Sequence, residues 1–124
     1  MTNPITDEEL FSYYTKLAKE KIENKDYHSA ISYLDKAINK NNSKSFCFND
    51  RAVCKTGLDD YSGAIEDYST AIELDQGKSS YFVNRGMTYW IWGKQDEAYK
   101  DWKKASSLGS ESAKANLNNY FNNN

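Results

Sequence analysis

Apolar residues recur along the chain at the spacing of α-helices, and polar clusters interrupt them at short, regular intervals. The first amphipathic segment starts after Thr6, where Thr6 and Glu9 have the spacing of a capping box. Its apolar stripe consists of Leu10, Tyr14, Leu17, Ala18 and Ile22. The polar residues 24–26 break the pattern, so we expect a helix that ends before them.

Six more segments of the same kind follow. We expect helices at residues 27–39, 46–56, 61–74, 81–92, about 95–108 and about 111–120. The last segment carries Ala113, Leu117 and Phe121 on one face and is too short to begin another helical hairpin. We therefore expect it to cover the open apolar end of the preceding hairpin.

The segments repeat at a fixed interval. Ala30, Ala64 and Ala98 are equally spaced and begin similar phrases, and a period of about 34 residues marks a solenoid of helical hairpins. Small residues also recur earlier in each unit, at positions 18, 52 and 86. Pairs of small side chains let two helix axes approach closely, so we expect the helices of each hairpin to cross there.

The repeated phrase resembles the tetratricopeptide repeat (TPR) family. The third unit matches through Phe82, Gly86, Tyr89, Gly93, Ala98, Trp102 and Ala105, and the middle unit through Asp60, Tyr61, Ala64, Tyr68, Ala71 and Asp75. The first unit is looser, with Ala18 in place of the glycine, and Asn42, Gln76 and Ser110 stand where the family often has proline. The resemblance implies a single all-α domain over residues 1–124, a right-handed superhelix of three hairpins. The implied repeats span about 11–44, 45–78 and 79–112, with a capping helix at about 111–121.

Charge and composition exclude several classes of partner. The net charge is −2, which gives no electrostatic footprint for nucleic acid. No apolar stretch has membrane-spanning length, and the N-terminus lacks the features of a secretory signal, so we expect a cytoplasmic protein without a membrane partner. Cys47 and Cys54 fall on one predicted helix, two turns apart, too far to bond to each other.

No set of residues suggests catalysis. The acidic pairs 59–60, 66–67 and 96–97 fall at predicted turns and first helical turns, where negative charge favours the helix dipole. The only histidine, His28, has no cluster of cysteines or carboxylates beside it. We expect no catalytic residues, no metal and no cofactor.

A binding groove is the remaining candidate site. In the TPR family the concave face is built from positions of the first helices that do not pack inside the hairpins. Among those positions, the apolar anchors would be Phe46, Val53, Val83, Met87 and Trp90, and the polar contacts Lys19, Asn49 and Asn84. The alternative is that the terminal helix or the curvature of the unit already covers the apolar residues.

The sequence therefore predicts an adaptor that binds a segment of a partner protein in its concave groove. The alternative is a structural protein that forms homo-oligomers through an exposed repeat face. Co-chaperones of the TPR family bind acidic C-terminal tails through lysine, arginine and asparagine side chains. The matching positions here are Thr15, Lys19, Asp50, Ser80 and Asn84. Only one cation remains, and Asp50 would repel a carboxylate, so we expect no specific binding of such tails.

Overall fold

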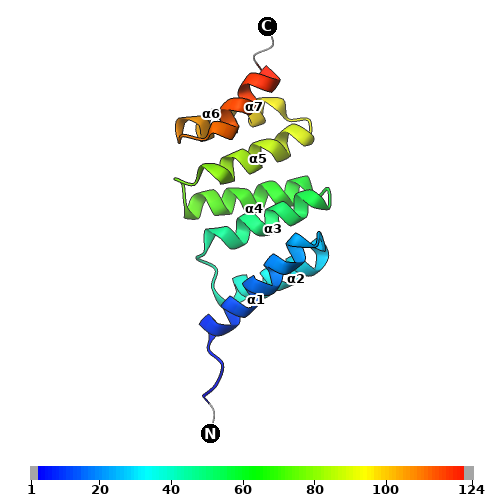
Figure 1. Ribbon diagram of the computed structural model, residues 1–124, viewed down its shortest axis with the longest axis vertical. Helices are drawn as coiled ribbons and strands as arrows, with labels where there is room; N and C mark the ends of the chain where they lie inside the picture. The colour runs from blue at the N-terminus through cyan, green and yellow to red at the C-terminus, as the bar shows by residue number, and fades with distance from the viewer. Residues whose placement is uncertain (1–2, 122–124) are drawn as a thin grey trace.

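Seven helices follow one another through residues 3–121, the part of the chain that this computed structural model describes. They are α1 (Asp7–Glu23), α2 (Tyr27–Lys40), α3 (Ser45–Gly57), α4 (Tyr61–Leu74), α5 (Ser79–Ile91), α6 (Gln95–Ser107) and α7 (Glu111–Phe121). The predicted all-α fold is confirmed, and most predicted helix ends lie within one or two residues of the observed ones. Figure 1 shows the helices stacked in chain order along the long axis, with the two termini at opposite ends.

The helices form three hairpins, α1–α2, α3–α4 and α5–α6, and each hairpin packs on the next. Side-chain caps start several of them. The capping box of Thr6 and Glu9 is present at α1. Asp26 and Asp60, one repeat apart, accept hydrogen bonds from the backbone N–H groups of Ser29 (3.4 Å) and Gly63 (3.1 Å) at the starts of α2 and α4.

The turn inside each hairpin contains a residue in the left-handed region of the backbone. These residues are Lys25 (φ 59°), Asp59 (φ 63°) and Gly93 (φ 85°), which again recur at the repeat interval. Only glycine adopts this conformation without a steric penalty. The first two hairpins therefore hold a strained backbone where the third has a glycine.

The predicted close approach of helices is confirmed. Ala30, Ala64 and Ala98 are fully buried where the second helix of each hairpin meets the first. At Gly86 a methyl group would lie 2.6 Å from Nε1 of Trp102, so a glycine is needed to admit the indole ring. The Trp102 indole N–H donates a hydrogen bond to the backbone oxygen of Val83, 3.2 Å away.

Two arginines join neighbouring helices. Arg51 on α3 binds the carboxylate of Asp67 on α4 through Nε and an Nη nitrogen, both at 2.8 Å, and reaches Asp35 on α2 at 2.8 Å. Arg85 on α5 binds Asp101 on α6 in the same way, at 2.8 and 2.7 Å, and reaches the Ser69 hydroxyl on α4 at 3.1 Å. Each arginine thus ties its own hairpin together and connects it to the preceding hairpin.

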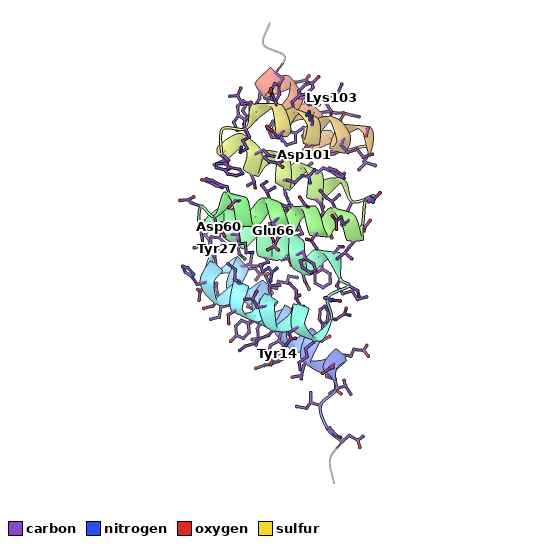
Figure 2. All side chains as sticks on the ribbon, turned by 180° about the vertical axis from the view of Figure 1, so that it is seen from behind. Tyr14, Tyr27, Asp60, Glu66, Asp101 and Lys103 are labelled. Carbon is purple, nitrogen blue, oxygen red and sulfur yellow. The ribbon has the colours of Figure 1, made fainter. Side chains whose placement is uncertain are left out.

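This arrangement corrects one sequence expectation. Asp60 caps a helix as expected, but Asp67 lies in the middle of α4, is 4% exposed, and pairs with both Arg51 and Lys55. Figure 2 labels its counterpart, Asp101, on α6. The recurrence of arginine and aspartate at the repeat interval could have revealed both pairs, since each aspartate follows its arginine at the same separation along the chain.

Candidate binding surface

The first helices of the hairpins, α1, α3 and α5, carry the residues predicted for the groove, and α3 and α5 are joined directly. Ser45 bonds to Tyr81 (2.9 Å), and Thr56 bonds to Thr88 (3.0 Å). Between them, the Asn84 amide donates to the Asn49 side-chain oxygen at 3.1 Å. The two asparagines predicted to contact a partner therefore also contact each other.

A hollow lies at the junction of α1 and α3. Its volume is about 510 Å³, and its lining consists of Thr15, Lys19, Ile22, Glu23, Phe46 and Asp50. Two of the predicted site residues, Lys19 and Phe46, meet here. The Phe46 side chain is 42% exposed, and its ring packs edge-on against Phe11 with the centroids 6.1 Å apart.

Asp50 is the half-buried carboxylate of this hollow, whereas Glu23 is exposed. Burial raises the pKa of its carboxyl, and a hydrogen bond with the neighbouring Asn49 amide and the positive charge of Lys19 only partly oppose that effect. The folded chain therefore holds a proton on Asp50 more tightly than an unfolded chain would. Ionisation of Asp50 therefore lowers stability; this cost is complete above the raised pKa of the folded chain, decreases as the pH falls through it, and is absent below the pKa of the unfolded chain.

The apolar residues of α5 are placed differently. Val83, Met87 and Trp90 pack, partly buried, against the C-terminal core, which also includes Trp102 and residues of α7. The Trp90 ring lies 5.9 Å from Trp102, 4.8 Å from Tyr120 and 5.5 Å from Phe121, between ring centroids. The terminal helix therefore contacts Trp90, one of the two arrangements that the sequence left open. Val53 packs against the middle core.

The structure thus separates the eight predicted residues into groups. Lys19 and Phe46 line the hollow, Asn49 and Asn84 form a polar link beside it, and the other four lie against the cores. Sequence reasoning assigned Asp50 only a repulsive role, because no sequence pattern indicates that the carboxyl is withdrawn from water. The available signal was its position four residues after Phe46, a spacing that places both side chains on the same face of a helix.

Three further observations concern metal binding, membranes and disulfides. Within residues 3–121, no three side chains of His, Cys, Asp or Glu are grouped so that they could hold a metal ion. Over the same residues, no helix combines the length and the apolar character required to cross a membrane. Cys47 and Cys54 are both buried in α3 as free thiols.

Helical hairpins that repeat and stack in chain order, with the first helix of each hairpin on a shared surface, define the class of helical solenoid proteins. A sequence model of the tetratricopeptide repeat family matches residues 11–42. Tetratricopeptide repeat protein 36 of Danio rerio is 34% identical over 96 residues, covering 74% of this chain and 51% of that protein. The chain belongs to the tetratricopeptide repeat family. It spans about half the length of the curated relatives it matches.

Solved structures agree on the fold. The second TPR domain of human RPAP3, in complex with the HSP70 peptide SGPTIEEVD, has a TM-score of 0.84 at 23% identity, covering 91% of this chain and 96% of that one. The first TPR domain of Spaghetti (RPAP3), bound to the HSP90 peptide SRMEEVD, has a TM-score of 0.84 at 18% identity, covering 94% of each chain. At these identities the likeness concerns the fold.

Proposed function

We propose that this domain is an adaptor that binds a segment of a partner protein along α1, α3 and α5, with no catalytic role. The observation that carries the proposal is the hollow between α1 and α3, where a half-exposed aromatic ring and polar groups line a volume of about 510 Å³. Aromatic anchors in partly closed pockets dominate the binding energy of many interfaces. The related domains captured with bound peptides support this kind of partner.

The groove of the proposal is centred on Lys19, Phe46 and Asp50. Asn49 and Asn84 bind each other and extend the polar edge of the groove toward α5. Val53, Val83, Met87 and Trp90 contribute the surface that their partial burial leaves accessible. The proposal includes a cytoplasmic location, in keeping with two buried, unbonded cysteines.

A selection of random twelve-residue peptides against the immobilised full chain tests the proposal. Peptides that bind the parent chain should bind Phe46→Ala at least about tenfold more weakly, because that substitution removes the aromatic anchor. Leu74→Ala is the matched control, since Leu74 is 44% exposed, close to the 42% of Phe46, but lies at the end of α4. Equal affinity for the two variants would place binding outside the groove.

Self-association is the second candidate function. Within residues 3–121, α1 is the first helix of the stack, and its Tyr13 is 57% exposed. Two copies could pair through this end of the stack. Sedimentation over a range of concentrations distinguishes the two functions, because a monomer at every concentration contradicts self-association.

A further inference from the structure

The hollow between α1 and α3 is lined by both apolar and charged side chains. The apolar ones are Phe46 and Ile22. The charged ones are Asp50, Glu23 and Lys19, whose formal charges sum to −1 when both carboxyls are ionised. A hollow of this kind complements a side chain that combines a long apolar stem with one positive charge.

The chain itself shows twice how such a side chain is held. The Arg51 guanidinium lies 5.6 Å from the centre of the Phe48 ring while two of its nitrogens bind Asp67. The Arg85 guanidinium lies 5.7 Å from the centre of the Phe82 ring while two of its nitrogens bind Asp101. In both cases an aspartate accepts two hydrogen bonds from the edge of the guanidinium, and a phenylalanine ring lies against the group.

Phe46 and Asp50 present these two groups without an arginine. They are four residues apart on α3, so their side chains lie on the same face of the helix, and both line the hollow. Among residues 3–121, no lysine or arginine forms an ion pair with the Asp50 carboxylate, although Lys19 lines the same hollow. The carboxylates of Asp67 and Asp101, by contrast, are both paired.

We propose that the hollow binds the side chain of a single arginine in a partner segment, with Asp50 at the edge of the guanidinium and Phe46 at its face. The inference rests on the proposed function, since it specifies what the groove recognises. Arginine fits better than lysine because its planar group binds a carboxylate through two nitrogens and stacks on a ring. Lys19 limits the charge that the hollow accepts, so a run of basic residues gains nothing over one arginine.

The peptide selection described above supplies the first test. Peptides that depend on Phe46 should contain arginine more often than the starting library, at one position flanked by apolar residues. Phe46-dependent peptides without arginine enrichment would overturn the arginine proposal and leave the proposed function standing. A selection that yields no Phe46-dependent peptides would overturn both.

The second test uses one selected peptide in three versions, with arginine, citrulline or lysine at the same position. Fluorescence anisotropy with the full chain should show binding weakened about tenfold or more when arginine is replaced by citrulline, its neutral near-isostere, and weakened less when it is replaced by lysine. Asp50→Asn should cause a similar loss for the arginine peptide and almost none for the citrulline peptide. If the citrulline and arginine peptides bind equally well, the proposal is wrong.

Glu66→Gln provides the matched control. It removes the same unit of charge, but Glu66 is exposed on α4, as labelled in Figure 2, and does not line the hollow. This variant should bind the arginine peptide like the parent chain. Equal weakening by Glu66→Gln and Asp50→Asn would show that overall charge attracts the peptide, which would overturn the assignment to Asp50. Thermal unfolding of both variants checks that the fold is retained.

Discussion

At the scale of residues, one position in the turn of each hairpin determines how much backbone strain that turn carries. Lys25, Asp59 and Gly93 occupy equivalent turns with positive φ, yet only the third is a glycine. Asp59 also accepts a hydrogen bond from the Tyr61 hydroxyl at 3.1 Å, whereas Lys25 is exposed and its side chain makes no contact that fixes it within residues 3–121. The strain at Lys25 can therefore be removed without loss of another interaction.

Lys25→Gly should stabilise the chain by about 0.5–1 kcal/mol, because relief of the left-handed conformation outweighs the added backbone freedom of the unfolded state. Chemical denaturation gives the difference in unfolding free energy. The reciprocal change, Gly93→Ala, places a side chain at φ 85° and should destabilise the chain by about 1 kcal/mol. Destabilisation by Lys25→Gly would contradict this account of the turn.

Trp90 packs in the C-terminal core and is also a predicted binding residue, and a substitution can separate these two roles. Its ring contacts Trp102, Tyr120 and Phe121, so Trp90→Ala should cost about 2–3 kcal/mol of stability, less than a fully buried tryptophan would. Unchanged thermal stability, together with lost peptide binding, would instead show that Trp90 belongs to the binding surface alone. Trp90→Phe, which keeps a ring, should recover part of the lost stability.

The sequence predicted the repeat, the crossings and most helix bounds because small residues and caps recur at one fixed interval. Ala64 must be small because two helices pack closely there, and the recurrence of alanine at the repeat interval reveals this requirement. The contacts of Trp90 depend on where α7 turns back after Ser110, and the sequence pattern left that open. The burial of Asp50 depends on the separation of α1 and α3, which no spacing within one helix encodes.

At the scale of elements, α7 packs on the last hairpin, α5–α6, and covers part of its core. Ala113 is fully buried, and Leu117 and Phe121 pack on the core that contains Trp102. Figure 1 shows α7 at the C-terminal end of the stack. Without it, one side of α6 would meet water.

Truncation after Ser110 should lower stability by several kcal/mol, because the apolar surface that α7 covers becomes exposed and Trp102 loses two ring contacts. Thermal unfolding monitored by circular dichroism measures the change. A shorter truncation, after Phe121, removes only residues 122–124 and serves as the control. A melting temperature equal to that of the full chain would show that α7 caps nothing.

At the scale of the whole molecule, the charges of the groove distinguish this chain from domains that bind acidic tails. Asp50 lies in the hollow, and among the residues that line it Lys19 alone is basic. A carboxylate that entered would meet two negative side chains. The fold that the chain shares with the RPAP3 domains therefore does not by itself imply the same ligand.

The peptide SGPTIEEVD, an acidic tail without arginine, should show no specific, saturable binding to the full chain, because Asp50 and Glu23 repel its carboxylates. Isothermal titration calorimetry at about physiological ionic strength is the stringent measurement, because long-range repulsion between like charges is screened there and cannot by itself hide a specific contact. Asp50→Lys should increase the affinity for the peptide. Micromolar binding to the parent chain would contradict this prediction.

The hairpins are joined by unequal numbers of side-chain hydrogen bonds, and this inequality predicts that the first junction is the more compliant of the two. Three side-chain hydrogen bonds and the Arg85–Ser69 contact fasten the second hairpin to the third, whereas Arg51–Asp35 is the single side-chain hydrogen bond across the first junction in residues 3–121. We expect amide hydrogens of α1 and α2 to exchange faster than those of α4 and α5. The first hairpin would then move relative to the other two hairpins. Because the hollow lies between α1 and α3, this motion would change its width to fit the partner segment that enters it.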